Sequence, residues 1–418
     1  MLSAIRLDAE MSGASVVLAV VLLVAGLPAA AGVCHLLLLV IASRLDRQPA
    51  PQGTPRSRLL VLVPAHNEAA IIASCVSGLL AQRYPEDLRR VVVIADNCED
   101  TTAAAAVSAG AEVWERRDPT RRGKGYALRW AFDRVLAEEQ ADALVVVDAD
   151  ARTDPDLLRE LESSFAAGSD AVQADYVVEP DSNSPRAHLE AAAVLLRNRV
   201  RFAGLQALGL SGGLSGSGML FSRGLLQSHP WEAFSTTEDS EYGLELVASG
   251  VPPFYAGRAH LVAPTTPSSA GAHSQGVRWE GGRFSSMISH SRRLLEVAFQ
   301  RRQPLLLLKA WDAALPPFTT LGLIAAVGTI SSVILAALCL IPWFGVTTWA
   351  VAIVLLPVYV FGGLWAAGAS RSTYLALLSF PLFIYRKLLV YAHVAGRRAD
   401  TQQWVRTERR DETGAPKS

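Results

Sequence analysis

The chain places carboxylate side chains directly after two apolar segments that have the length of buried strands. Asp96 follows the run 91–94, and Asp148 and Asp150 follow the run 144–147. Such a run is typical of a strand covered on both faces, and open α/β sheets bind ligands at the carboxyl ends of their strands. Two acids two residues apart can reach one divalent ion that bridges a diphosphate. The pair therefore predicts a metal site, although an acidic turn after a strand is also common surface chemistry.

Two further polar residues lie at the starts of predicted helices. Asp239 follows Glu238 at the beginning of a predicted helix over 238–248, so its carboxylate would project into the cleft and could act as a general base. The alternative is a plain capping acid, and the helix dipole would keep it ionised in either case. Lys124, in a turn flanked by glycines, can approach a nucleotide or a diphosphate at a helix start, or be an ordinary basic turn.

A third cluster has side chains suited to binding a polar ring. Trp279 offers a flat apolar face, Arg278 can pair with a diphosphate, and Gln275 can bond hydroxyl groups. Gln275 shares one face of a helix with Arg278 or Trp279, although a tryptophan on a helix can equally be core packing. Gly216 and Gly218 would let the backbone approach an acceptor, or would form the turn before a strand at 219–221.

These residues are positioned by strands and helices that alternate along the middle of the chain. The pattern begins with a strand at 59–63 and predicts a doubly wound α/β sheet of the nucleotide-binding type. After that strand we expect a helix at 68–82, a strand at 91–95, a helix at 101–109, a helix from the loop 121–125 to 138, the strand before Asp148, a helix capped by Asp154 and Pro155, and a strand at 171–178.

Composition excludes several classes of protein. The 39 basic residues balance the 39 acidic ones, so nothing indicates a partner that is a nucleic acid or another polyanion. Half of the residues are hydrophobic, and the excess is concentrated at the two ends. The four cysteines, Cys34, Cys75, Cys98 and Cys339, show no paired spacing. We therefore expect neither a disulfide framework nor a zinc site, and a reducing compartment fits.

The N-terminal apolar segment predicts a membrane anchor. Residues 15–43 contain no Asp, Glu, Lys or Arg, and about 20 residues suffice to cross a bilayer. A cleaved signal peptide is the alternative, but its apolar core is shorter, roughly 7–15 residues. Arg44, Arg47, Arg56 and Arg58 follow the segment and Arg6 precedes it. The positive-inside rule therefore leaves the middle of the chain in the cytosol.

Two more segments of spanning length lie near the C-terminus. Residues 318–341 and 344–370 are free of Asp, Glu, Lys and Arg, and we expect a hairpin that returns to the cytosol. Residues 374–385 are also apolar, but Arg386 and Lys387 shorten the run, so this segment is expected to lie in the interface. The segment 304–317 is expected to lie on the surface too. The prediction is three spans, with a fourth possible.

Seven motifs, taken in order, resemble the signature of membrane-bound family 2 glycosyltransferases, the group of cellulose, chitin and hyaluronan synthases and ceramide glucosyltransferases. The resemblance covers about residues 59–283. The motifs are Pro64-Ala65-His66-Asn67-Glu68, Ala95-Asp96-Asn97, Gly123-Lys124-Gly125-Tyr126-Ala127-Leu128, Asp148-Ala149-Asp150, Gly216-Ser217-Gly218-Met219, Thr237-Glu238-Asp239 and Gln275-x-x-Arg278-Trp279. The resemblance implies a GT-A fold, Mg²⁺ or Mn²⁺ as cofactor, and inversion at the sugar carbon. It also implies a nucleoside-diphosphate sugar as donor, with a UDP-sugar favoured.

The resemblance also implies a role for each matching residue. Asp150 would bind the metal, and Asp148 would contact both the metal and the ribose. Glu68 and Asp96 would bind the base and ribose, with the backbone of Ala65 and His66 framing the base; without a ligand, Glu68 would be a favourable acid in the first turn of a helix. Further implied contacts are Lys124 to the donor, Asp239 as general base, Glu238 to the acceptor or its loop, and Gly218, Gln275, Arg278 and Trp279 to the acceptor or the diphosphate.

Three functions follow as hypotheses. The first is an inverting transferase that makes a β-linked polysaccharide or oligosaccharide on a membrane-proximal saccharide acceptor. The second is the same chemistry on a lipid acceptor such as a polyprenyl phosphate, a diacylglycerol or a sphingolipid, and the third is a non-catalytic membrane scaffold, which would be expected to have broken acidic motifs. Processive members tend to have more spans after the catalytic domain than the two predicted here, so a self-contained polysaccharide pore is doubtful.

The predicted protein is integral to the plasma or inner membrane, with its catalytic domain in the cytosol and with a nucleotide sugar, an acceptor and the bilayer as partners. The expected divisions of the chain are a tail at 1–14, a span at 15–43, a linker at 44–57, a GT-A domain at 58–303, an interfacial segment at 304–317, spans at 318–341 and 344–370, a membrane-associated helix at 371–396 and a polar tail at 397–418.

Overall fold

The computed structural model describes residues 12–46, 48, 53–138, 140–180, 184–265, 288 and 290–379 of the 418-residue chain. Contacts divide the chain into two compact units. One unit comprises Met1–Ile41 and Leu315–Trp365, and the other comprises Ala42–Ala314 and Ala366–Ser418. We call the first the helical unit and the second the sheet unit.

The sheet unit is built on one mixed sheet of eight strands in the order β3-β2-β1-β4-β7-β6-β8-β5. The pairs β1·β2, β1·β4, β2·β3 and β6·β8 are parallel, and β4·β7, β6·β7 and β5·β8 are antiparallel. The strands are β1 Leu59–Ala65, β2 Arg89–Asp96, β3 Glu112–Arg116, β4 Ala143–Val146, β5 Arg152–Thr153, β6 Ala171–Glu179, β7 Met219–Ser222 and β8 Phe254–Pro264.

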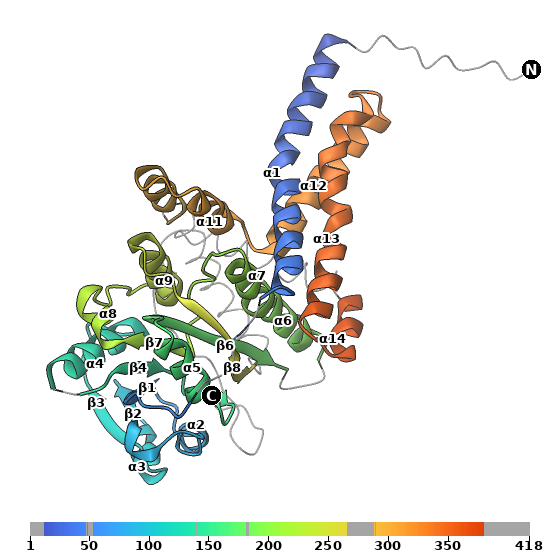
Figure 1. Cartoon of the computed structure of the whole chain (residues 1–418). Helices are drawn as coiled ribbons and strands as arrows, with labels where there is room; N and C mark the ends of the chain where they lie inside the picture. The colour runs from blue at the N-terminus through green and yellow to red at the C-terminus, as the bar shows by residue number, and fades with distance from the viewer. Residues whose placement is uncertain are drawn as a thin grey trace, which may run out of the picture. The chain divides into compact units, whose positions relative to one another are not determined.

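Helices cover both faces of this sheet, which explains why its central strands are apolar throughout (Figure 1). Successive side chains of a strand point to opposite faces, so Val61 joins one buried cluster and Leu62 joins the other. The first cluster includes side chains of α2 Ile72–Leu80, α3 Thr102–Ser108 and α5 Leu157–Ala166, and the second includes those of α4 Lys124–Glu138, α8 Arg223–Ser228 and α9 Glu238–Ser249.

The predicted strands are found as β1, β2, β4, β6 and β7, whereas β3, β5 and β8 were not predicted. Each of these three is short or contains charged residues, so it lacks the continuous apolar run that identifies a buried strand. The predicted cap of α5 by Asp154 and Pro155 is wrong, because the N-cap residue is Asp156, which makes no side-chain cap hydrogen bond. Instead, Asp154 Oδ1 accepts the backbone N–H of Asp156 at 3.0 Å and forms the turn before the helix.

The sheet unit has further helical elements before β2, after β6 and after β8. They are the 3₁₀ turn η1 Glu86–Leu88, α6 Pro185–Leu195, the π-helix η2 Leu196–Val200, α7 Arg201–Ala207, helical residues 290–300, α11 Pro304–Ala314, α14 Arg371–Ala376 and η4 Leu377–Ser379. The π-helix places Arg199 so that Nε and Nη2 donate to the fully buried Asp175 of β6 at 2.9 and 2.5 Å. Tyr255 and His260 of β8 also bond Asp175, which fixes these strands together.

The helical unit contains α1 Gly13–Ser43, α12 Phe318–Ala337, η3 Trp343–Val346 and α13 Thr347–Ala366. Within the described residues, three helical segments are long and apolar enough to cross a membrane: Gly13–Ser43, Phe318–Ala337 and Trp343–Ala366. The predicted fold, a mixed α/β sheet with one N-terminal and two C-terminal apolar helices, is therefore confirmed. Of the apolar segment 374–385, the structure describes residues up to 379, in α14 and η4.

Small residues allow the three apolar helices to approach closely (Figure 1). A Cβ on Gly26 would stand 2.2 Å from Thr348 Oγ1, and one on Gly328 would stand 2.2 Å from the ring of Trp349. The Thr348 hydroxyl donates to the carbonyl of Leu23, and the Trp349 indole N–H donates to that of Leu22, each at 2.9 Å. Both polar side chains are thus satisfied by α1.

Candidate active site

Three of the predicted site residues lie close together because the strands that they follow or end, β1, β2 and β4, are parallel neighbours, so their carboxyl ends meet at the same edge of the sheet. Asp96 is the last residue of β2, Ala65 is the last residue of β1, and Asp148 follows β4 by two residues. The turn after β4 is held to the loop before β7, since the backbone N–H of Asp148 donates to Ser217 Oγ at 3.0 Å. The topology therefore brings residues 65, 96 and 148 to the same edge.

Lys124, the first residue of α4, connects this edge to the loop before β7. Its Nζ donates to Asp148 Oδ1 and to the carbonyl oxygen of Gly216, each at 2.5 Å. Burial lowers the pKa of Lys124, but the carboxylates of Asp148, Glu238 and Asp239 outweigh burial and leave the pKa above its ordinary value. Lys124 is therefore a fixed positive charge among acidic groups.

Asp239, the second residue of α9, reaches the same place. A Cβ on Gly216 would stand 3.3 Å from Asp239 Oδ2 and 3.7 Å from Lys124 Nζ. Gly216 has φ 90°, and only glycine adopts this region without strain. The predicted general base and the predicted donor-binding lysine thus both lie close to the same glycine.

The site is strongly acidic. Burial, and then the charge of Asp239, raises the pKa of Glu238 to about 7, with Asp148 adding to the effect and Lys124 opposing it. Burial also raises the pKa of Asp148, where Lys124 opposes and the charges of Asp150 and Asp239 contribute. One lysine among these four carboxyl groups leaves an excess of negative charge. Carboxylate oxygens and excess negative charge are what a hard divalent cation requires, so these residues fit the implied Mg²⁺ or Mn²⁺.

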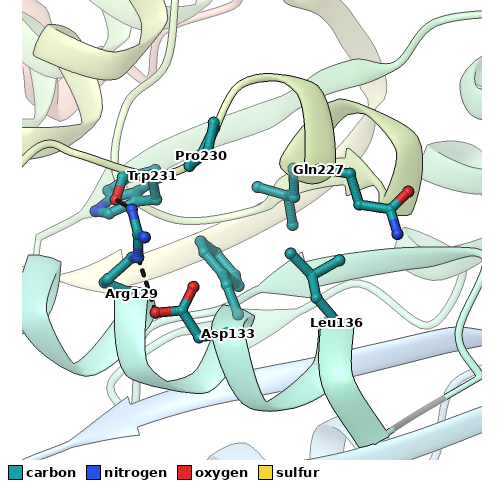
Figure 2. A pocket seen from close by; sticks show the side chains of 8 residues that line it. Arg129, Asp133, Leu136, Gln227, Pro230 and Trp231 are labelled. Carbon is teal, nitrogen blue, oxygen red and sulfur yellow. Dashed lines mark hydrogen bonds and ion pairs between the residues drawn. The ribbon is translucent and has the colours of Figure 1, made fainter.

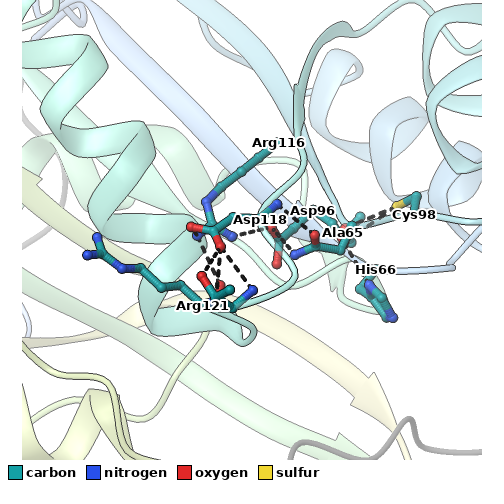
Figure 3. Close-up of polar contacts among 9 residues, drawn as sticks. Ala65, His66, Asp96, Cys98, Arg116, Asp118 and Arg121 are labelled. Carbon is teal, nitrogen blue, oxygen red and sulfur yellow. Dashed lines mark hydrogen bonds and ion pairs between the residues drawn. The ribbon is translucent and has the colours of Figure 1, made fainter.

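Asp96 lies in a second polar cluster, on the β2–β3 side of the edge (Figure 3). It is 6% exposed, and Arg116 Nη1 of β3 donates to its Oδ1 at 2.6 Å. His66 Nδ1 lies 2.7 Å from the backbone carbonyl oxygen of Asp96, and Cys98 Sγ lies 3.5 Å from that of Ala65. The ends of β1 and β2 are thereby held together at the predicted base-binding position.

Glu68 precedes α2, which begins at Ile72, so the interpretation of Glu68 as an acid in the first helical turn is wrong. Its backbone N–H donates to Thr102 Oγ1 at 2.7 Å, and its carbonyl accepts from the backbone N–H of Ile72 at 3.0 Å. The turn that holds Glu68 is therefore fixed to the start of α3. Its assigned contact with the donor stays a prediction.

Gly218 has a packing explanation of its own. A Cβ at this position would stand 2.5 Å from Leu261 Cδ2 and 2.6 Å from Ala174 Cβ, and φ is 69°. The tight packing and the positive φ require glycine at this position, directly before β7. Its contact with an acceptor stays a prediction. Gln275, Arg278 and Trp279 lie outside the residues that the structure describes.

Arg116 and a surface pocket between α4 and α8 were not predicted from the sequence. Arg116 ends β3, which has charged residues in place of a continuous apolar run. Its position beside Asp96 comes from the parallel pairing of β3 with β2. The pocket, of 230 Å³, contains none of the predicted site residues (Figure 2). At its edge Arg129 donates to the carbonyl of Trp231 at 3.0 Å and pairs with Asp133 at 2.9 Å, so it helps to hold the loop that leads to Asp239.

The family described as "Glycosyltransferase like family 2" matches residues 55–282. A β-monoglucosyldiacylglycerol synthase from Synechocystis is 34% identical over 115 residues, 27% of this chain and 24% of that protein. A hexosyltransferase of low-salt glycan biosynthesis from Haloferax volcanii is 34% identical over 110 residues, 26% of this chain and 25% of that protein. The matches therefore span about a quarter of each relative.

Among solved structures, a mannosyltransferase from Pyrobaculum calidifontis, in complex with GDP-mannose and Mn²⁺, is similar with a TM-score of 0.50 and 21% identity. The similarity covers 82% of this chain and 97% of that protein. This likeness shows a shared GT-A fold.

Proposed function

Because this chain belongs to glycosyltransferase-like family 2, we propose that it transfers a hexose from a nucleoside-diphosphate donor to an acceptor at the membrane, with inversion at the anomeric carbon. The observation that supports this most is the convergence of Lys124, Asp148 and Asp239 around Gly216. These residues come from three separate segments of the chain. Their meeting provides a cation for a phosphate and a carboxylate for a proton within one site.

In the proposed reaction, Asp239 accepts the proton of the acceptor hydroxyl as its oxygen attacks the anomeric carbon. The bond from that carbon to the diphosphate breaks, and the nucleoside diphosphate leaves. A positioned base of this kind typically contributes about 10²–10⁴ in rate. Lys124 lies beside Asp239 and would stabilise negative charge on the leaving diphosphate.

A divalent cation, when bound, would neutralise charge on the diphosphate. Asp148 and Asp150 would hold it, because they follow β4 at the acidic side of the site. Within the part of the chain that the structure describes, no three His, Cys, Asp or Glu side chains form a complete ligand set.

Two acceptors are proposed. The first is a membrane-proximal saccharide, which would give a β-linked polysaccharide or oligosaccharide. The second is a lipid such as diacylglycerol, and the synthase from Synechocystis, whose name states a glucosyldiacylglycerol product, favours it. Three candidate spans support an integral membrane protein, and we propose that the sheet unit is on the cytosolic side, where nucleotide sugars are available.

The central experiment is Asp239→Asn in the purified full chain. We expect transfer from a nucleotide sugar to fall by about 10²–10⁴, since an amide cannot accept the proton, while donor binding stays near that of the wild type. Asp133→Asn, an exposed carboxylate on α4, is the matched control and should retain activity. Near-normal turnover of the Asp239 variant would contradict the proposed role.

The class of acceptor is tested by the size of the product. With a labelled donor and native membranes, a single labelled species in the organic extract supports the lipid acceptor. A ladder or an insoluble product supports the saccharide acceptor. A chain that hydrolyses or transfers none of a panel of nucleotide sugars would contradict the proposed function altogether.

A further inference from the structure

Gln173, a fully buried residue of β6, holds the loop that contains Gly216. Its Oε1 accepts the backbone N–H of Ser215 at 2.8 Å. Its Nε2 donates to the backbone carbonyls of Ser217 and Ala174 at 2.8 and 2.9 Å. A side-chain amide has two N–H groups that donate and one carbonyl oxygen that accepts. Both N–H groups and the oxygen are therefore paired, and the two bonds to the loop reach the residues on either side of Gly216.

The loop itself contains two glycines, which leave its conformation open. Gly216 and Gly218 have φ values of 90° and 69°, and a glycine backbone has many accessible conformations. Gly218 is held at the start of β7 by backbone hydrogen bonds to β4 and β6 at 2.9 and 2.8 Å. Among the residues that the structure describes, the buried hydroxyl group of Ser215 has no hydrogen-bond partner. On the side of the sheet, the position of residues 215–217 is therefore set by the Gln173 amide.

The loop in turn fixes two groups of the proposed site. The carbonyl oxygen of Gly216 accepts from Lys124 Nζ at 2.5 Å, and the hydroxyl oxygen of Ser217 accepts the backbone N–H of Asp148 at 3.0 Å. A Cβ on Gly216 would stand 3.3 Å from Asp239 Oδ2. A shift of the loop would therefore take the carbonyl away from the ammonium group, and Lys124 could turn towards Asp239.

The carbonyl of Gly216 is a suitable partner for Lys124 because it is uncharged. Lys124 already pairs with Asp148 at 2.5 Å. A carbonyl oxygen accepts a further hydrogen bond without adding negative charge, so the ammonium group keeps its attraction for the leaving diphosphate. Pairing with Asp239 instead would weaken that attraction and would engage the proposed base. Charges and donors that are fixed in advance act mainly on the transition state.

We propose that Gln173 is a positioning residue for the transfer: it clamps the loop on both sides of Gly216 and so keeps Lys124 directed at the leaving diphosphate and apart from Asp239. Gln173 is buried away from the reacting groups and acts through the loop. The inference rests on the proposed function. It predicts that loss of the amide lowers kcat more than it lowers the affinity for the donor.

The test uses the purified full chain and the nucleotide sugar that it transfers best. Gln173→Met keeps the length and approximate volume of the side chain and removes its hydrogen bonds. One preorganised donor typically contributes about 10²–10³ to kcat, and a displaced one loses part of this, so we expect kcat to fall about ten- to hundredfold. Calorimetric titration with the matching nucleoside diphosphate in Mn²⁺ should show a smaller loss of affinity.

Gln82→Met is the matched control, because Gln82 is also a buried glutamine whose amide holds a turn. Its Nε2 donates to the backbone carbonyl of Asp154 at 2.7 Å, and its Oε1 accepts the backbone N–H of Leu158 at 3.1 Å. Both substitutions should lower the melting temperature. At a temperature where both variants are folded, Gln82→Met should keep the kcat of the wild type. Equal falls in kcat would show that Gln173 acts only through stability and would contradict the inference.

A double-mutant cycle with Lys124→Met tests whether Gln173 acts through the lysine. In that case Gln173→Met adds little to the fall in kcat that Lys124→Met causes. Independent losses in the cycle would contradict the inference.

Gln173→Asn supplies a second variant if Gln173→Met does not fold. It keeps the amide but is shorter by one methylene group, so it cannot reach both Ser215 and Ser217. An unchanged kcat in a folded Gln173→Met or Gln173→Asn would overturn the inference. A wild type that transfers sugar from none of the nucleotide sugars would overturn the proposed function, and this inference with it.

Discussion

The charges around Lys124 do not balance in the protein alone. Asp148, Glu238 and Asp239 surround one ammonium group, and Asp150 adds a further carboxylate. Burial, together with the neighbouring negative charges, raises the pKa of Glu238 and of Asp148, and this favours keeping a proton or binding a cation. The site is therefore arranged to be neutralised by a ligand, which is consistent with a metal-bound diphosphate.

Removing Asp150 should weaken the part of donor binding that depends on the metal. We expect Asp150→Ala to reduce UDP affinity by roughly ten- to hundredfold in Mn²⁺ and to change it little in EDTA, because the aspartate would act through the ion. Calorimetric titration with and without Mn²⁺ measures both values. Asp156→Ala, a carboxylate paired with Arg83 on the surface, serves as the control. An equal loss in the two buffers would show that Asp150 does not act through a metal.

Glu238 predicts a dependence of stability on pH. Its pKa is raised from 4.5 to about 7, chiefly by burial, so the folded chain keeps a proton there that the unfolded chain loses at lower pH. The stabilisation that this proton gives is complete below pH 4.5 and is lost as pH rises towards 7. In EDTA, Glu238→Gln should therefore be more stable than the wild type at pH 8, by roughly 1–3 kcal/mol, and similar at pH 4.5.

The measurement is thermal unfolding of both proteins across this range of pH. Glu232→Gln is the control, because the side chain of Glu232 is 76% exposed and stays largely hydrated in the folded chain. A constant difference between Glu238→Gln and the wild type at all pH values would show that Glu238 does not keep its proton.

At the scale of single residues, the sequence predicts where Asp96 and Asp148 lie in the fold. It does not predict which side chains contact them. Asp96 and Asp148 follow apolar runs, so a strand pattern alone places them at one edge of a sheet. Arg116 could not be found in this way, because β3 has charged residues at its start and end. The neighbourhood of Glu238 depends on how α9 packs, and no local pattern contains that information.

At the scale of elements, α4 and the loop before α9 form one support for both halves of the site. Lys124 begins α4, and the next residue, Gly125, lies so close to the loop that a Cβ would stand 2.3 Å from the carbonyl oxygen of Ala233. The rings of Tyr126 and Phe234 stack with centroids 4.5 Å apart. The donor-binding lysine and the proposed base are thereby kept in register.

Gly125→Ala should disturb this support. Alanine is favoured over glycine in a helix by about 1 kcal/mol, but here the methyl group would displace the backbone at Ala233. We expect a lower melting temperature and a fall in kcat larger than the loss of UDP affinity, because Asp239 follows the displaced loop. Enzyme kinetics and thermal unfolding of the purified chain measure these effects.

Gly224→Ala is the matched control, since Gly224 is also the second residue of its helix, α8. A Cβ there would meet only Ser222 Oγ at 4.0 Å, so this variant should be neutral or more stable. Equal effects of Gly125→Ala and Gly224→Ala would argue against the role of the contact between Gly125 and the loop at Ala233.

The helices and strands were predictable where the burial of apolar side chains alone determines their pattern. Buried central strands and α4 have the periodicity that packing requires, and the long apolar helices exceed the length that a bilayer needs. The strands β5 and β8 are held by pairing with each other and by the bonds from Asp175, which join residues far apart in sequence. Non-local pairing of this kind leaves no periodic signal.

At the scale of the whole molecule, the segment before the second apolar helix has an exposed apolar face. Helical residues 290–300 bury Leu294 against Val247 and Ala310, and Arg293 bonds Glu245 of α9 at 2.6 Å. Along residues 288–307 of this segment, the large apolar side chains left exposed are Ile288, Leu295, Phe299, Leu305 and Leu307. Arginines 292, 301 and 302 accompany them, a combination typical of a helix that lies on an anionic membrane surface.

We expect this face to contact lipid, because α11 ends at Ala314 and the apolar helix α12 begins at Phe318, which keeps the segment within a few residues of a proposed span. A spin label at Phe299, 74% exposed, should be accessible to oxygen and protected from a water-soluble nickel reagent in nanodiscs that contain anionic lipid. A label at Gln227, exposed on α8, should show the reverse. The four native cysteines would first be replaced. The helix α9 packs on this helix and carries the proposed base, Asp239, as its second residue. A label at 299 that stays in water would therefore also remove the reason to place Asp239 beside a membrane-bound acceptor.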